Sequence, residues 1–148
     1  MYASMFVWLS GSMLVLIDAY AIEARVAGFL LAMGSAGFMV GAWVSGRIGT
    51  QYSPNKLILL GSGVAILAAL SILLFDLLGV RHGSAVAFPA FVWMFGHGLH
   101  YPQSMAGAVA PFPENAGAAS SLIGFYQTTA AAIMAFLMGL VHDGSAIP

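Results

Sequence analysis

The sequence predicts an all-α integral membrane protein with five transmembrane helices. Of its 148 residues, 61% are hydrophobic and only 6% are charged, and the mean hydropathy is +0.96. A soluble domain carries about 25% charged residues, because it must offer water a polar surface. The few charges leave five uncharged runs: 1–17, 26–46, 57–75, 82–113 and 115–142. A helix needs about 20 residues to cross the hydrocarbon core, and four of these runs reach that length.

Charged residues bound the first three expected helices. The first, about 3–17, ends at the first charge of the chain and is short for a full crossing. The second, about 26–46, and the third, about 57–76, begin directly after Arg25 and Lys56. The runs are apolar throughout, whereas barrel strands alternate apolar and polar residues, so helices are favoured over a β-barrel.

A proline-containing segment separates the last two helices. The fourth, about 85–109, ends before APFPEN, residues 110–115, and the fifth, about 116–141, follows it. Asn115 is a suitable N-cap for this fifth helix. All connections are short, so consecutive helices should be antiparallel neighbours. Residues 1–148 are therefore expected to form a single transmembrane region without a soluble domain.

Small residues recur where close contacts between helices are expected. In the second helix Gly37 and Gly41 form a GxxxG pair, Ser45 continues the stripe, and Gly117 lies near the start of the fifth helix. Such stripes let backbones approach in a membrane, where no hydrophobic effect drives helix association. Packing or kinking within one bundle explains them better than a dedicated dimer interface.

Two histidines lie at mid-membrane depth in the fourth helix. His97 and His100 share one helix face, because residues three apart are neighbours. Even a neutral histidine costs free energy in lipid unless it has a partner, so this face should point into the bundle or a hydrated cavity. A proton-binding role is chemically possible, because the ordinary pKa of histidine lies near physiological pH. The alternative is that the two side chains only line the cavity.

No cofactor or metal is expected at these histidines. A haem needs axial histidines on facing helices, but the other two, His82 and His142, lie near helix ends. A metal would need further ligands, and the sequence places no carboxylate or thiolate at this depth.

Pro102 lies in the same helix and should kink it, because proline removes a backbone hydrogen bond. Membrane helices tolerate such a residue where neighbours or water satisfy the freed carbonyl. The kink could serve as a pivot, although packing explains it equally well.

Three segments carry a family resemblance. GRIGTQYSPNKLILLG follows the second helix, G-x-G-x-x-x-P spans Gly96, Gly98 and Pro102, and PFPENAGAASSLIGFYQ covers 111–127. In this order and spacing the chain resembles the C-terminal half of the major facilitator superfamily, and more narrowly its Bcr/CflA group of multidrug resistance drug/proton antiporters. The last segment is the most specific of the three.

The resemblance implies a transporter of twelve spans in two six-helix halves, with the substrate path between them. The five helices would be the seventh to eleventh of these, and the N-terminal half would be missing. The chain is thus expected to be a fragment that does not transport alone, multi-pass in a bacterial inner membrane. Its partners would be the lipid bilayer, the missing half, a small amphipathic drug-like substrate and protons.

Aromatic and uncharged polar residues on two helices are candidates for the substrate path. Their rings and amides could stack on, and hydrogen-bond to, an amphipathic substrate; the alternative is hydrogen bonding between helices. The candidates are Trp93, His97, His100, Tyr101, Gln103, Tyr126 and Gln127.

The loop after the second helix has two interpretations. Gly46, Arg47 and Lys56 could act as a conformational latch, or the two basic residues could anchor the loop on the positive, cytoplasmic side. The count of basic residues is equal on both sides, and the resemblance places this loop in the cytoplasm.

Other classes of function find little support. There is no basic patch for nucleic acid, and there is no nucleophile–base pair, phosphate-binding glycine loop or carboxylate pair for an enzyme. The remaining alternative is a small non-transporting membrane subunit or remnant that packs with partner helices.

Overall fold

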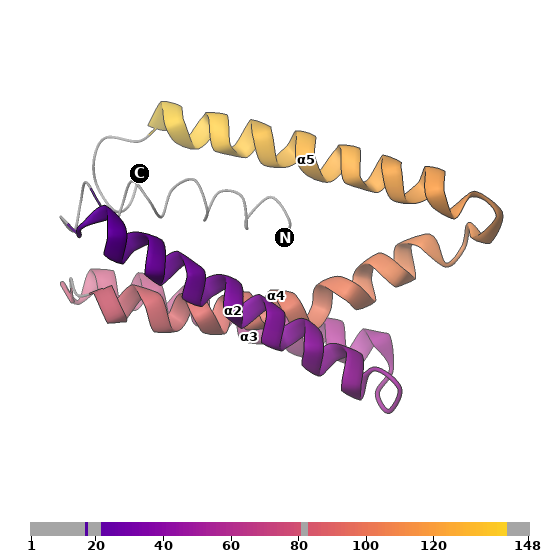
Figure 1. The fold of residues 1–148 in the computed structure, drawn as a ribbon, viewed down its shortest axis with the longest axis horizontal. Coiled ribbons are helices and arrows are strands. Elements are labelled where there is room, and N and C mark those ends of the chain that lie inside the picture. Colours follow the sequence, from indigo (N-terminus) through magenta and orange to yellow (C-terminus); the bar gives the residue numbers. More distant parts are fainter. Residues whose placement is uncertain (1–16, 18–21, 81–82, 142–148) are drawn as a thin grey trace. The chain divides into compact units, whose positions relative to one another are not determined.

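The computed structural model describes residues 17, 22–80 and 83–141. This part of the chain is helical and contains no strand. Its elements are α2 (Ala24–Ile48), α3 (Pro54–Leu77), α4 (Gly83–Val109), the short 3₁₀ helix η2 (Pro113–Asn115) and α5 (Ala116–Val141) (Figure 1). Apart from Ile17, the helix expected at 3–17 lies outside the described residues, as do His82 and His142.

The helices extend beyond the charged residues that bound the uncharged runs. α2 includes Arg25 and Arg47, and α3 begins at Pro54, two residues before Lys56. Proline suits the first position of a helix, because its missing N–H has no partner there. A charge marks where a helix meets the membrane surface, whereas the backbone can continue helical into the headgroup region. The helices are therefore longer than the uncharged runs.

α3 ends in a glycine-dependent turn. Gly79 has a φ of 72°, in the left-handed region that favours glycine. Its N–H donates to the Asp76 carbonyl at 2.9 Å, and the Val80 N–H donates to the Phe75 carbonyl at 3.0 Å. This is the Schellman arrangement, which satisfies carbonyls that the helix end would leave unpaired.

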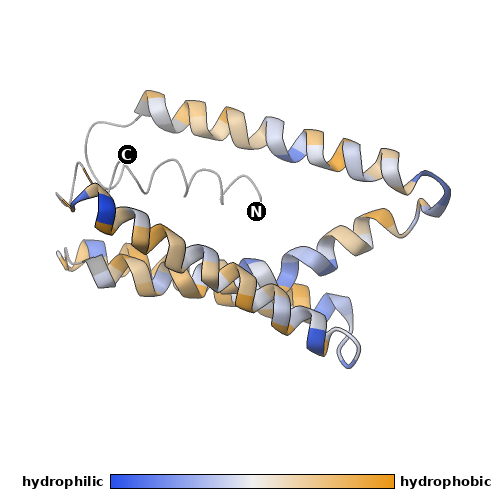
Figure 2. Cartoon of the chain, viewed as in Figure 1, coloured by the Kyte–Doolittle hydropathy of each residue, from blue (hydrophilic) through white to orange (hydrophobic). Residues whose placement is uncertain are grey.

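Three helices in the described part are long and apolar enough to cross a membrane: Ala24–Ile48, Pro54–Leu77 and Pro113–Leu137. α4 has 27 residues and is also long enough, but its polar residues make it less apolar than the others. Figure 2 shows hydrophilic positions at the helix ends and again at the bend of α4. The multi-helix membrane class is thus supported, while five spans stay a prediction.

The chain divides into two compact units. One comprises residues 29–111, which hold most of α2 together with α3 and α4, and the other contains η2 and α5. Within the first unit α4 packs against both neighbouring helices through glycine and alanine. A Cβ added at Gly96 would lie 2.6 Å from the Gly61 carbonyl oxygen, so α3 and α4 are in backbone contact there.

Candidate functional site

Two glycines place α4 between its neighbours. A Cβ added at Gly96 would also lie 2.8 Å from the Ala65 nitrogen of α3, and one added at Gly98 would lie 2.7 Å from the Ala42 nitrogen of α2. Successive residues of a helix are about 100° apart, so the contacts at these two glycines lie on widely separated sides of α4. His97, which lies between them in sequence, is directed to a side that neither contact occupies.

The GxxxG pair of α2 belongs to the same packing. A Cβ added at Gly37 would collide with the Phe91 carbonyl, and one added at Gly41 would collide with the Phe95 carbonyl. The structure therefore places both glycines against α4, inside one unit.

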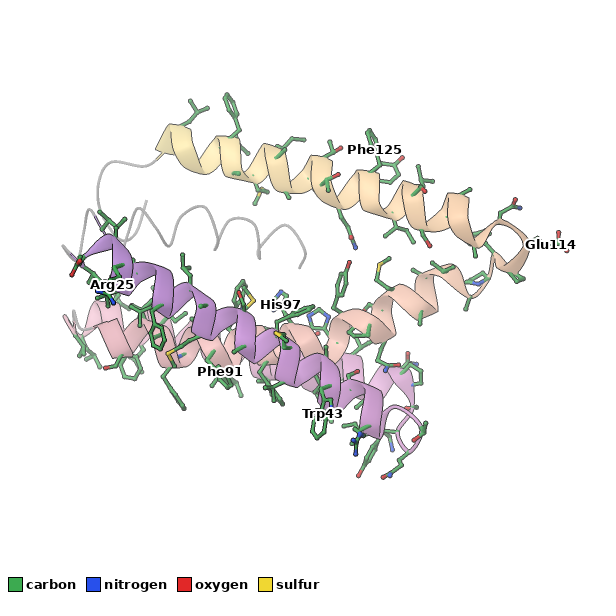
Figure 3. All side chains as sticks on the ribbon, viewed as in Figure 1. Arg25, Trp43, Phe91, His97, Glu114 and Phe125 are labelled. Carbon is green, nitrogen blue, oxygen red and sulfur yellow. The ribbon has the colours of Figure 1, made fainter. Side chains whose placement is uncertain are left out.

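Three rings form a row along one side of α4. The centroids of Trp93 and His97 are 4.5 Å apart, and those of His97 and His100 are 5.0 Å apart. All three side chains are buried, with the two histidines only 4% and 3% exposed. Figure 3 shows His97 on one side of the unit, while Phe91 and Trp43 project from the other.

The two histidines differ in their hydrogen bonds. The Nδ1 of His97 lies 3.3 Å from the Trp93 carbonyl oxygen. A carbonyl only accepts, so Nδ1 carries the hydrogen in this contact. In His100 neither ring nitrogen has a hydrogen-bond partner among the described residues. A buried polar group without a partner is rare in proteins and calls for an explanation.

Further along α4, two candidates of the substrate path contact α2. The Nε2 of Gln103 donates to the hydroxyl of Ser45 at 3.1 Å, and Ser45 is fully buried. Tyr101 is half-buried, and the centroid of its ring lies 6.2 Å from the ring centroid of Phe38. Sequence reasoning missed Ser45 as the partner of Gln103; the available signal was a polar residue in the small-residue stripe of α2.

Pro102 lies inside α4 between these two residues, and the helix continues past it. Because proline lacks an N–H, the carbonyl of Gly98 loses its intrahelical partner. Figure 1 shows α4 bent, with its last stretch turning away from α2 and α3.

The remaining candidates of the substrate path lie on α5, in the other unit. Tyr126 is 65% exposed, and the centroid of its ring lies 6.0 Å from the ring centroid of Phe125. Gln127 is half-buried. Near the start of this helix, a Cβ added at Gly117 would meet nothing within 4 Å in the part of the chain that the structure describes.

The loop residues lie at helix ends. The Arg47 guanidinium carbon is 4.8 Å from the ring centroid of Trp43, a cation–π contact on an exposed surface. Lys56 is exposed in the first turn of α3. Among the described residues, a Cβ added at Gly46 would meet nothing within 4 Å. Within the described ranges, no three histidine, cysteine, aspartate or glutamate side chains come together as metal ligands.

Comparison with known proteins finds two bacterial relatives. The chain is 32% identical over 115 residues to multidrug resistance protein D of Escherichia coli, covering 76% of this chain and 28% of that protein. It is 35% identical over 92 residues to multidrug resistance protein MdtL of Shewanella oneidensis, covering 62% of this chain and 23% of that protein. The chain thus spans about a quarter of their lengths. No family model matches it, and no solved structure matches it significantly.

Proposed function

We propose that this chain, which is related in sequence to multidrug transporters of the major facilitator superfamily, forms part of the C-terminal half of a proton-coupled multidrug efflux transporter. The relationship to two multidrug resistance proteins carries this proposal. It also confirms the family resemblance that the three sequence segments indicated. The relatives are transporters and not enzymes.

The side of α4 that bears Trp93, His97 and His100 would line the substrate path. A drug-like substrate is mostly apolar with a few polar groups, and it needs rings to stack on and a few convergent hydrogen-bonding groups. The path would continue through Tyr101, which directly follows His100, and through Gln103, which lies about one helical turn after His100. Tyr126 and Gln127 would add the same chemistry from α5.

Proton coupling would use the histidines. His97 and His100 are buried in the middle of α4, and ionisable residues in the middle of membrane helices mark proton or ion pathways. In the described part of the chain every Asp, Glu, Lys and Arg lies at a helix end or in a loop. The histidine pair is therefore the group best suited to exchange a proton with the path.

Transport would proceed by alternating access, in which two halves rock about a site at mid-membrane depth. The bend at Pro102 would be a pivot in α4, because a freed carbonyl makes local changes of helix geometry less costly there. Gly46, Arg47 and Lys56 would act as a latch on the cytoplasmic side of a bacterial inner membrane. The other half of the transporter, lipid, substrate and protons would be the partners.

A chimera tests this proposal. The matching 115-residue segment of the Escherichia coli relative is replaced by that of this chain, and drug efflux is measured in a strain without other drug exporters. We expect efflux that depends on the proton gradient, and none from this chain expressed by itself. A second measurement, the amount of chimera in the membrane, separates failure to fold from failure to transport.

The alternative is a small membrane subunit or remnant that only packs with partner helices. Large apolar side chains exposed along α5, including Phe125, Phe136 and Leu140, are available for such packing. A chimera that reaches the membrane in normal amount but exports no drug would favour this alternative. Efflux that does not depend on the proton gradient would contradict the proposed proton coupling.

A further inference from the structure

We propose that His97 and His100 form a site for a single proton, in which His97 carries the charge and His100 accepts a hydrogen bond from it. The inference rests on the proposed proton coupling. It adds how many protons the pair binds and what each histidine does. His97 is the proton-binding residue, and His100 is a positioning residue.

The contact to the Trp93 carbonyl assigns the charge to His97. Its Nδ1–H already donates to this oxygen, at 3.3 Å. A neutral imidazole with the hydrogen on Nδ1 keeps its lone pair on Nε2. A proton arriving from water would bind there, and the resulting imidazolium would retain a backbone acceptor for Nδ1–H. Hydrogen bonding to the charged form favours that form.

His100 supplies the second acceptor. Its two ring nitrogens have no hydrogen-bond partner among the described residues, and the side chain is only 3% exposed. In a neutral imidazole one of these nitrogens carries a lone pair. The backbone of His100 lies close to α3, because a Cβ added at Gly61 would lie 3.0 Å from the Cβ of His100.

The distance between the rings suits a shared proton. Hydrogen-bonded nitrogens are about 2.8 Å apart and each lies about 1.1 Å from its ring centre, so two bridged imidazoles have centres about 5 Å apart. The centroids of His97 and His100 are 5.0 Å apart. The rings are inclined at 55°, so the bridge requires them to rotate until the two nitrogens face each other.

A second proton is disfavoured. It would occupy the lone pair that accepts the bridge and would place two positive charges side by side in a poorly screened interior. On α3, the residue that lies against His100 is Gly61, which is not titratable. Tyr101, on α4 itself, is a phenol and offers no negative charge near neutral pH. The charged residues of the described part all lie at helix ends or in loops: Glu23, Arg25, Arg47, Lys56, Asp76 and Glu114.

Nitrogen NMR of the whole chain in lipid nanodiscs tests the site directly. With ¹⁵N-labelled histidine, the imidazole signals report how many protons each ring carries as the pH is lowered. The signals are assigned with His82→Asn and His142→Asn, which leave the pair intact. We expect the pair to gain one proton, with both nitrogens of His97 protonated while His100 stays neutral. Uptake of two protons in one step, or a charged His100 beside a neutral His97, would overturn the proposal.

Two substitutions of His100 separate its role as acceptor from its role in packing. His100→Asn retains an oxygen that can accept the bridge, and His100→Leu fills similar space without an acceptor. We expect His97 to bind its proton about tenfold more weakly in the leucine variant than in the asparagine variant. Equal binding in both would contradict the bridge. His97→Asn should abolish proton uptake by the pair.

The NMR experiment involves neither drug nor transport, so its result is independent of the efflux assay. A single-proton site in a chain whose chimera exports no drug would leave this inference standing and remove the proposed function. Proton-dependent efflux from a chimera whose histidine pair binds no proton would contradict this inference and leave the proposed transport function standing.

Discussion

The contact between α2 and α4 at Gly98 leads to a prediction that the structure makes quantitative. In Gly98→Ala the new Cβ would collide with the Phe38 carbonyl and would lie 2.7 Å from the Ala42 nitrogen. Both obstacles are backbone atoms, so no side chain can rotate away. Ordinary contact requires about 3.5 Å, so clearing the Ala42 nitrogen alone would part the two helices by roughly 0.8 Å, and clearing the closer Phe38 oxygen would part them further.

Gly107→Ala is the matched control, because it makes the same substitution in the same helix where a Cβ would meet nothing within 4 Å. Alanine is a better helix former than glycine by up to about 1 kcal/mol, so the control should be neutral or slightly stabilising. Overpacking typically costs about 1–3 kcal/mol, and Gly98→Ala should therefore be less stable than the control by at least about 1 kcal/mol.

The measurement is the free energy of unfolding of the chain in detergent micelles, followed by circular dichroism for wild type and both variants. The energy difference between the two alanine variants cancels their shared gain in helix propensity. If Gly98→Ala is as stable as Gly107→Ala, the close approach of α2 and α4 at Gly98 is wrong.

Four further substitutions test three other features of the fold. Ser45→Ala and Gln103→Leu should each destabilise the chain, and a double-mutant cycle should give a coupling of about 0.6–1.7 kcal/mol for their hydrogen bond; additive effects would show that the bond contributes nothing. Gly79→Ala should cost about 1 kcal/mol in the same unfolding assay because of the positive φ, and an unchanged stability would contradict that turn. Pro102→Ala restores an N–H for the Gly98 carbonyl and should straighten α4, so the chimera should keep its membrane level but export drug more slowly; unchanged export rates would exclude the pivot.

The helical segments within the described residues could be predicted well from the sequence, and their ends less well. The expected helices at 57–76 and 116–141 correspond to α3 (Pro54–Leu77) and α5 (Ala116–Val141). The difference at Pro54 arises because charge reports the depth of the membrane, whereas the end of a helix is set by local backbone chemistry such as proline at the first position.

The candidate site could be predicted in part. Helical spacing alone puts His97 and His100 on one face, and the rings are indeed neighbours. The difference in their partners could not be predicted, because it depends on the Trp93 carbonyl and on what packs around each ring. For Tyr126 and Gln127 on α5, spacing defines a helix face, and their place in the substrate path stays a proposal.

By itself, the sequence determined that this chain is a helical membrane protein, and its motifs showed which transporters it resembles. Hydrocarbon thickness and the lack of water in the bilayer act on each segment separately, so length and composition along the chain are sufficient for that conclusion. Only the tertiary structure decided that Gly96 and Gly98 fit α4 against different helices and that Gln103 meets Ser45, 58 residues away. Such contacts depend on how closely two backbones approach, and that distance is a property of pairs of helices.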